Sequence, residues 1–425
     1  MRRFAVALLH AVAVLVSREA TAAGFALREN SATGLGTAFA GAASSASDVS
    51  TIFNNPAGMT KLPGSEAGAV LTVIYPSIHF RGTGTAGGGD GGDAGGANLV
   101  PALYAMYEVS PDWKVGLAVT SPFGLKTRYN SDWVGRYLGI NTSLKTIDVN
   151  PNVAYRVNDW FSVGGGFSAQ YLKADEDKAI DFSVLGAPDG RARTIADGVG
   201  WGYNLGFLLE PRQGTRVGLT YRSRIENTLD GHEVFYGVPA GLPGGLASAF
   251  TNASAELSLT LPDNAIISAT HKVTSALTVM SDVQWTHWST FDDVRIVPTG
   301  TNGAPDFTHV GFRDTVFVSL GASYRLSGGW TLRGGVAYDQ SPVRREFRTV
   351  RVPDDDEIII SVGASYEFGD SFRVDIGYIH RFINDAGMND SINASAATSG
   401  NGASRIFGSF DVKADELSIA ARLKF

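Results

Sequence analysis

Residues 417–425 read LSIAARLKF, and their alternation is the clearest indication of the fold in this chain. Every second residue from Leu417 to Phe425 is apolar, and the residues between them are small or charged. A period of two with one continuous apolar face is typical of a half-buried β-strand. The end of the chain therefore predicts a strand that turns one face toward an apolar medium.

The same alternation occurs further inside the chain. Residues 316–326 and 358–368 each place large apolar side chains on one face. The opposite face is small and polar, as in Ser319, Gly321 and Ser323. Such a face suits the lumen of a large barrel better than the interior of a β-sandwich.

The connections between these strands alternate in length. Six short turns are expected at 110–112, 158–159, 211–215, 274–276, 327–329 and 369–370. Seven longer polar stretches are expected near 81–98, 123–143, 176–198, 231–250, 298–309, 342–355 and 384–407. Thirteen connections join 14 strands, and this asymmetry is typical of outer-membrane barrels. We predict an all-β fold, a 14-stranded antiparallel transmembrane β-barrel over residues 65–425. The alternative, a secreted β-sandwich array, would not require the asymmetry.

The composition excludes several classes of function. The 425 residues contain no Cys, so disulfides, thiolate metal sites and Cys nucleophiles are excluded. The formal charge of −7 argues against a nucleic-acid partner. None of the seven His lies at zinc-site spacing, so we expect no metal and no cofactor. No GxSxG motif is present, and we do not expect an enzyme, although a membrane hydrolase built from scattered strands has no motif to test.

The N-terminus resembles an export signal. Arg2 and Arg3 precede the apolar stretch 4–16, and 20–22 read Ala-Thr-Ala, the small-x-small pattern of a cleavage site. The apolar stretch is too short to span a bilayer as a helix. We expect a cleaved signal peptide over residues 1–22.

Residues 23–64 do not share the period of two. They are rich in Gly, Ala and Ser, with Asp48 as a candidate helix N-cap and Pro56 as a helix stop. Their low charge favours a plug, or hatch, containing short helices and folded into the lumen. A periplasmic tail is the alternative.

A family resemblance covers nearly the whole mature chain. Residues 23–27 (AGFAL), 31–41 (SATGLGTAFAG) and the triplet Asn55-Pro56-Ala57 resemble the N-terminal hatch of the FadL family. This family comprises FadL, TodX and channels similar to outer membrane protein P1, which carry long-chain fatty acids and other hydrophobic molecules. The resemblance continues in the stretches 121–137, 284–296 and 337–356.

The resemblance implies a mechanism of passive uptake. A hydrophobic molecule would occupy an internal pocket, and hatch movement would release it laterally into the bilayer. The lateral opening would lie at a kink in the third strand, near Pro122, Phe123 and Gly124. Proline cannot donate to a strand ladder and glycine weakens it, so a break there is physically reasonable. The alternative is that Pro122 simply ends the strand.

The resemblance also suggests substrate-binding residues. Phe25 would contact an acyl chain, Lys173 and Arg295 would face its carboxylate inside the barrel, and Asp354 would be a counter-charge. The acidic run 175–177 could neutralise Lys173, which favours an uncharged hydrocarbon.

We therefore expect a channel for long-chain fatty acids or other hydrophobic molecules. Uncharged aromatic hydrocarbons are the alternative substrate, and a general diffusion porin or structural protein is the alternative class. We expect a monomer in the outer membrane of a Gram-negative bacterium, with the hydrophobic molecule and outer-membrane lipid as its partners.

Overall fold

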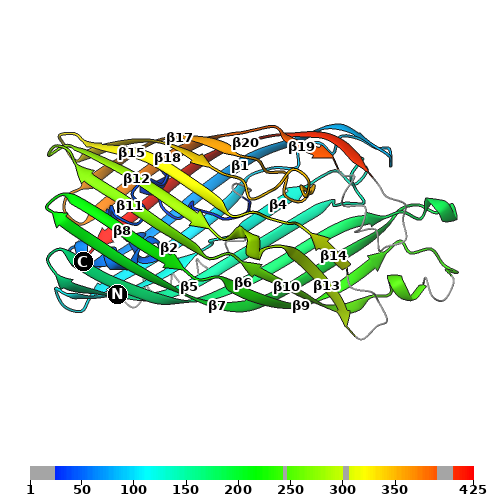
Figure 1. The fold of residues 1–425 in the computed structure, drawn as a ribbon, viewed down its shortest axis with the longest axis horizontal. Helices are drawn as coiled ribbons and strands as arrows, with labels where there is room; N and C mark the ends of the chain where they lie inside the picture. The colour runs from blue at the N-terminus through cyan, green and yellow to red at the C-terminus, as the bar shows by residue number, and fades with distance from the viewer. Residues whose placement is uncertain (1–23, 243–246, 300–305, 390–404) are drawn as a thin grey trace.

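The strands form one closed antiparallel sheet (Figure 1). The computed structural model describes residues 24–242, 247–299, 306–389 and 405–425. β1 (Glu66–Gly84) pairs along its whole length with β20 (Ile406–Lys424), so the last strand closes onto the first. The signal peptide expected over residues 1–22 lies outside the described residues.

The described residues contain twenty strand segments that build 14 strands. Eight strands are single segments: β1, β2 (Asn98–Glu108), β5 (Asn141–Asn158), β6 (Phe161–Ile180), β7 (Gly190–Arg212), β16 (Trp330–Asp339), β17 (Glu357–Phe368) and β20. Six are interrupted: β3 (Trp113–Thr120) with β4 (Gly124–Arg128), β8 (Thr215–Arg222) with β9 (Ile225–Tyr236), β10 (Ala253–Leu261) with β11 (Asn264–Lys272), β12 (Leu277–Thr286) with β13 (Asp293–Thr299), β14 (Asp306–His309) with β15 (Thr315–Arg325), and β18 (Phe372–Ile383) with β19 (Ala386–Asn389). The predicted 14-stranded antiparallel barrel is confirmed.

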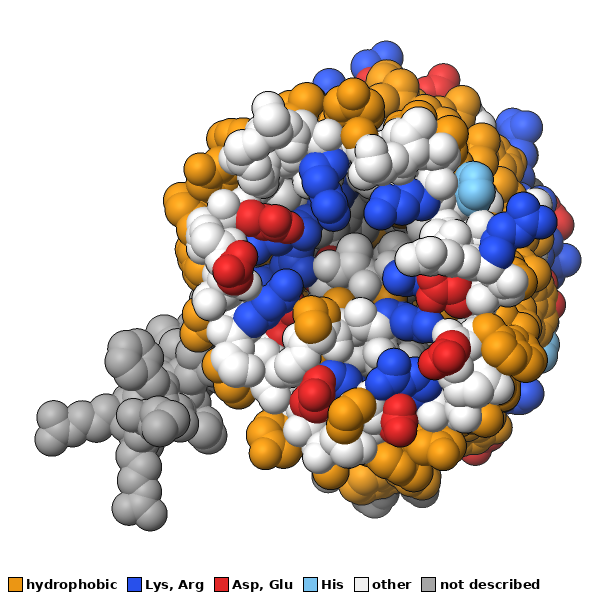
Figure 2. All heavy atoms as spheres, turned by 90° about the vertical axis from the view of Figure 1, so that its left-hand side faces the viewer, with side chains coloured by type: hydrophobic (Ala, Val, Ile, Leu, Met, Phe, Trp, Pro, Cys, Tyr) orange, Lys and Arg blue, Asp and Glu red, His pale blue; other side chains and the backbone are white. Residues whose placement is uncertain are grey.

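The two faces of the strands follow the alternation in the sequence. In β15, Val318 and Leu320 are 40% and 59% exposed, whereas Phe317 and Ser319 are buried. Figure 2 looks at the barrel from the end where the C-terminus lies, and hydrophobic side chains surround its outer circumference. Among the described residues, no helix is both long and apolar enough to cross a membrane.

Much of the predicted loop 176–198 is strand. β6 continues to Ile180 and β7 begins at Gly190, although 176–198 reads as a polar connection. The polar residues there form cross-strand ion pairs: Arg193 lies 2.7 Å from Asp175, and Arg191 lies 2.6 Å from Asp177. Opposite charges on facing strands stabilise a sheet, so polarity in this stretch does not mark a loop.

The N-terminal segment crosses the inside of the barrel (Figure 1). It contains α2 (Ala32–Leu35), α3 (Thr51–Asn54) and the 3₁₀ turn η1 (Pro56–Lys61). α2 packs against β17, β18 and β20, whereas η1 packs against β3, β5, β6 and β7. The other short helical turns, η2 (Ser183–Leu185), η3 (Ser248–Phe250) and η4 (Trp288–Thr290), lie in connections. The expected N-cap Asp48 is replaced by Ser50, because the Asp48 carboxylate instead accepts the Ser50 amide in a local turn.

Glycines make room for this segment in the barrel wall. Gly321 lies opposite Gly335, and a Cβ on Gly335 would come within 2.3 Å of the Thr37 backbone. Gly164 lies opposite Gly206, and a Cβ on either would collide with the turn at Asn55 and Pro56. The small inner face of the strands therefore accommodates the backbone of the N-terminal segment. Its action as a movable hatch stays a prediction.

Candidate functional site

A cluster of buried apolar side chains occupies the inside of the barrel on the side of the long loops. Its members come from β4, β5, β6, β7, β9, β10 and β13 and from the adjoining connections. We call this set the apolar cluster; it includes Leu125, Leu172, Leu257 and Ile296. An internal apolar region lined by many strands can hold a hydrophobic molecule.

Phe25 lies among the aromatic rings of the apolar cluster. Its ring centroid is 4.8 Å from Trp288, 5.0 Å from Phe291 and 6.0 Å from Phe123. The contacts to Trp288 and Phe291 are edge-on, the geometry that the ring quadrupole favours. Phe25 is 1% exposed, so its ring is buried within the apolar cluster.

Asp354 anchors the residue before Phe25. Its Oδ2 accepts the Gly24 amide at 2.8 Å and the Ser341 hydroxyl at 2.7 Å. Burial raises the pKa of Asp354 from 3.8 to about 6, against the lowering effect of these two hydrogen bonds. The residue predicted as a counter-charge therefore contacts the backbone beside Phe25.

The third strand is interrupted where the sequence predicted a kink. Segment 25–27 pairs with the interruption: the Leu27 amide donates to the Pro122 carbonyl at 2.8 Å, and the Gly124 amide donates to the Phe25 carbonyl at 2.9 Å. Within the described residues, β4 pairs only with β5, and β2 pairs with β3 only from Leu103 onward. The N-terminal segment thus forms hydrogen bonds with backbone groups beside the break that do not pair with β2. Release of a substrate at this break stays a prediction.

A cavity of about 160 Å³ lies between the N-terminal segment and the wall. Its lining includes Pro122 and Phe123 at one side and the charged residues Arg222, Asp282 and Arg333 elsewhere. The interior beneath the apolar cluster therefore combines apolar side chains with a few buried charges. Figure 2 shows Lys and Arg side chains gathered around the central hollow at the end of the barrel where the C-terminus lies.

The two cations expected at the substrate carboxylate point away from the apolar cluster. Lys173 is exposed and stands between Leu172 and Ala174, both of which face the cluster. Arg295 is likewise exposed and precedes the buried Ile296. Because neighbouring side chains in a strand point to opposite faces, their expected position inside the barrel is wrong. The acids expected to crowd Lys173 also have other partners, since Asp175 pairs with Arg193.

A different cation lies above the apolar cluster. Arg351 is adjacent to the cluster residue Val352, and its guanidinium lies 3.3 Å from Glu176 and 3.2 Å from the Thr308 hydroxyl. Glu176 is two residues beyond the cluster residue Ala174 on the same face of β6. Sequence reasoning missed Arg351, although it lies in the 337–356 stretch that carries the resemblance.

The Asn55-Pro56-Ala57 triplet lies at the other end of the N-terminal segment. The Asn55 amide donates to the carbonyls of Ala43 and Phe207 at 2.7 and 3.0 Å, and its oxygen accepts the Ala57 amide. Asn55 thus links the segment to β7 and caps η1, which begins at Pro56. Its role in hatch movement stays a prediction.

Buried ion pairs hold the two residues that follow Leu27 to the wall. Arg381 on β18 pairs with Glu29 at 2.6 Å and also with Glu357 and Glu416. Arg28 pairs with Asp339. Removing one partner of a buried pair leaves an uncompensated charge, which is strongly destabilising.

A closed barrel with an apolar outer face, an inner apolar cluster and its own N-terminal segment across the lumen defines a class of plugged outer-membrane channels. Residues 13–425 match the family model described as outer membrane protein transport protein (OMPP1/FadL/TodX). The chain belongs to this family, so the predicted family and the outer-membrane location are confirmed.

Relatives that match over most of their length support this assignment. The long-chain fatty acid transport protein of Escherichia coli K12 is 31% identical over 410 residues, covering 87% of this chain and 91% of the relative. Outer membrane protein P1 of Haemophilus influenzae is 28% identical over 429 residues, covering 89% and 90%.

Solved structures give the same result. A Pseudomonas aeruginosa FadL homologue superposes with a TM-score of 0.88 at 25% identity, covering 95% of this chain and all of the homologue. The Pseudomonas putida toluene transporter TodX superposes with a TM-score of 0.70 at 15% identity, covering 92% and 97%, and this likeness concerns the fold alone.

Proposed function

We propose that this chain is a passive channel that takes up long-chain fatty acids or other hydrophobic molecules without covalent chemistry. The observation that carries this proposal is the apolar cluster inside the barrel, in which the Phe25 ring is buried. The similar protein of Escherichia coli is named a long-chain fatty acid transport protein, which supports the same substrate class.

The route follows from the contacts of the N-terminal segment. A hydrophobic molecule enters at the long loops and displaces Phe25 from its ring contacts inside the apolar cluster. Movement of residues 24–27 then frees Pro122 and Gly124, the backbone partners of Leu27 and Phe25. The gap between β2 and β4 opens toward outer-membrane lipid, and the molecule leaves sideways. A monomer suffices for this route, because every group named belongs to one chain.

Arg351 is our candidate for the partner of a fatty-acid carboxylate. Glu176 occupies it at 3.3 Å, so an incoming carboxylate must displace Glu176, whereas an uncharged molecule leaves the pair intact. A charge-assisted hydrogen bond contributes about 1.5–3 kcal/mol, or roughly ten- to a hundredfold in affinity. Arg351→Gln should therefore weaken binding of oleate by about tenfold or more and leave binding of methyl oleate nearly unchanged.

Arg345→Gln is the matched control, because Arg345 lies in the same connection but is exposed. Glu176→Gln should have the opposite effect and strengthen oleate binding. Equal losses for oleate and its methyl ester in Arg351→Gln would remove Arg351 as the carboxylate partner.

Uptake of labelled oleate tests the function itself. Gram-negative cells that lack their own long-chain transporter should take up oleate when they produce this chain. If the protein reaches the outer membrane and oleate uptake stays at background, uptake of toluene tests uncharged aromatic hydrocarbons. Uptake of a small hydrophilic sugar without either of these would indicate a general porin.

A further inference from the structure

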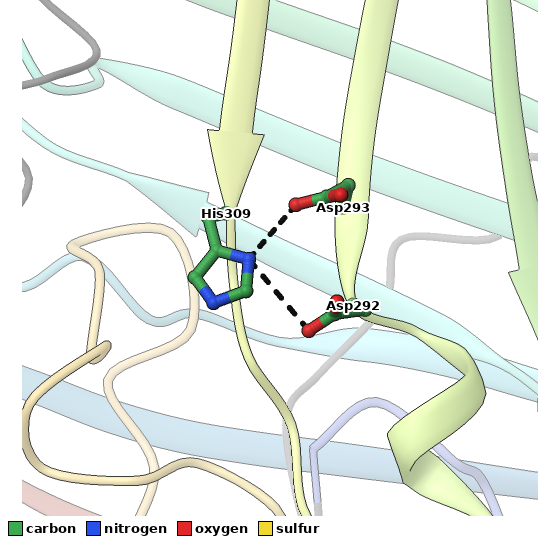
Figure 3. Close-up of side chains that lie close together, drawn as sticks. All are labelled: Asp292, Asp293 and His309. Atoms are coloured by element: carbon green, nitrogen blue, oxygen red, sulfur yellow. Dashed lines mark hydrogen bonds and ion pairs between the residues drawn. The ribbon is translucent and has the colours of Figure 1, made fainter.

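Two carboxylates and an imidazole converge outside the lumen, on the wall beside the apolar cluster (Figure 3). Asp293 on β13 lies directly opposite His309 on β14, and Asp292 precedes Asp293. The His309 Nδ1 is 2.8 Å from an Asp293 oxygen and 3.6 Å from an Asp292 oxygen. The ligand atoms of all three residues lie within 4.8 Å of one another.

A hydrogen bond to His309 accounts for only one of the two carboxylates, Asp293. A neutral imidazole carries at most one proton on Nδ1, yet both carboxylates approach that nitrogen from different sides (Figure 3). Two carboxylates and a neutral imidazole carry two negative charges, which a divalent cation would neutralise. The mixed oxygen and nitrogen donors suit first-row transition ions better than magnesium or calcium.

The backbone holds the three donors in place. The Asp292 carbonyl accepts the amides of Val310 and Gly311 at 2.8 and 3.1 Å. The His309 ring lies 4.9 Å from the Phe347 ring in an edge-on contact, which restrains its orientation. A site whose donors are restrained before the ion arrives loses less entropy on binding.

We propose that Asp292, Asp293 and His309 form a site for a divalent transition-metal ion such as Zn²⁺. The three side chains are exposed, so water completes the coordination, as in zinc sites with three protein ligands. The ion links the two strands immediately beside Phe291, Val310 and Phe312, which belong to the apolar cluster. Bound metal therefore braces the wall of that cluster. The nearby Arg344 donates to the Gly311 carbonyl at 2.6 Å, and its positive charge lowers the affinity of the site for a cation.

The sequence did not indicate this site. Sixteen residues separate Asp293 from His309, and the spacing matches no zinc motif. Only the pairing of β13 with β14 places the side chains opposite each other.

Calorimetric titration of Zn²⁺ into the purified full-length barrel in detergent tests the proposal. We expect one saturable site per chain in the unmodified protein. Substituting His309→Gln or Asp293→Asn should lower the affinity by at least about tenfold, the lower bound for disturbing the partners of a metal ligand. His232→Gln is the matched control, since His232 is also exposed but lies on β9. Heat-modifiable mobility on gels verifies that each variant is folded.

Hydrogen exchange gives an independent readout. Zn²⁺ should slow exchange of the Val310 and Gly311 amides in the unmodified chain and not in Asp293→Asn. No saturable Zn²⁺ uptake by the folded protein, or equal uptake by wild type and both ligand variants, would overturn the site. Neither readout depends on fatty-acid transport, so the proposed function stands or falls separately.

Discussion

The two ends of the N-terminal segment are held to the barrel by different forces. Residues 24–27, which we call the tip, rest on aromatic packing around Phe25, on two backbone hydrogen bonds at a broken strand and on the hydrogen bond from Gly24 to Asp354. Residues 41–57, which we call the base, rest on directional bonds. The amides of Gly41 and Ala42 donate to Asp282 at 2.5 and 3.0 Å, and Asn55 bonds to β7.

This difference indicates where the segment can move. The hydrophobic part of the Phe25 contacts is non-directional, so another apolar molecule can take the place of the ring. A buried hydrogen bond that is broken without replacement leaves an unpaired polar group, at a cost of about 1–3 kcal/mol. We therefore expect the tip to move on substrate binding and the base to stay in place.

Two buried carboxylates, Asp354 beside the tip and Asp48 in the base, differ in their pKa. Burial raises the pKa of Asp354, beside the tip, to about 6. At the base, burial also opposes ionisation of Asp48, but Arg422 and hydrogen bonds from Ser50 and Thr33 outweigh it and lower its pKa to about 2. Asp48 thus stays charged at all physiological pH values, whereas Asp354 titrates close to them.

The largest effect is expected from Phe25→Ala at the tip. Truncating a buried Phe costs about 3–5 kcal/mol, and here the loss falls on docking of residues 24–27. We expect faster hydrogen exchange at Leu27 and reduced oleate uptake, with the barrel still folded. Phe167→Ala is the matched control, because Phe167 is 73% exposed on the outer face. Unchanged hydrogen exchange at Leu27 would show that packing of Phe25 does not hold the tip to the barrel.

The next effect is expected from Gly335→Ala at the inner wall. The added Cβ would lie 2.3 Å from the Thr37 backbone, and such overpacking costs about 1–3 kcal/mol. The N-terminal segment should shift, and the ion conductance of the protein in planar bilayers should rise. Gly334→Ala is the control on the same strand, because its nearest atom is the Ser361 carbonyl oxygen at 3.7 Å. Equal conductance in the two variants would show that the glycines do not accommodate the segment.

A smaller effect is expected from pH through Asp354. Its folded pKa of about 6 exceeds the ordinary 3.8, so its stabilising contribution is complete below 3.8 and is lost as the pH rises through 6. The folded protein should lose about 1.5 kcal/mol of stability, a roughly tenfold change in its opening equilibrium, between pH 5 and pH 7.5. Protection factors at Leu27, corrected for intrinsic exchange, measure this change. Asp354→Asn should remove the pH dependence, and a persistent dependence would assign it to another group.

The smallest effect is expected from Lys173→Ala and Arg295→Ala. Both side chains are exposed and lie on the face opposite the apolar cluster, where substitutions change stability by about 0.5 kcal/mol or less. Oleate affinity should stay within twofold of the unmodified protein, compared with Arg351→Gln in the same assay. A selective loss of oleate binding in either variant would show that these side chains reach the substrate.

Sequence reasoning succeeded where the signal is local and repeated. The alternation in 316–326 and 417–425 correctly indicated which side chains face outward, because the period of a strand depends on the backbone alone. It failed for Lys173, where a one-residue difference from Leu172 decides the face. It also failed for 190–198, because cross-strand ion pairs allow a polar stretch to continue β7.

The sequence by itself determined the closed 14-stranded barrel, the family and the presence of a segment unlike the strands. These properties follow from periodicity, turn spacing and motifs, each readable over a few dozen residues. Only the tertiary structure decided the contacts that give the barrel its site. Phe25 meets Trp288, Arg351 meets Glu176, and Asp293 meets His309 because barrel closure and strand register bring distant residues together. Such contacts depend on long-range pairing of strands, and no local pattern encodes them.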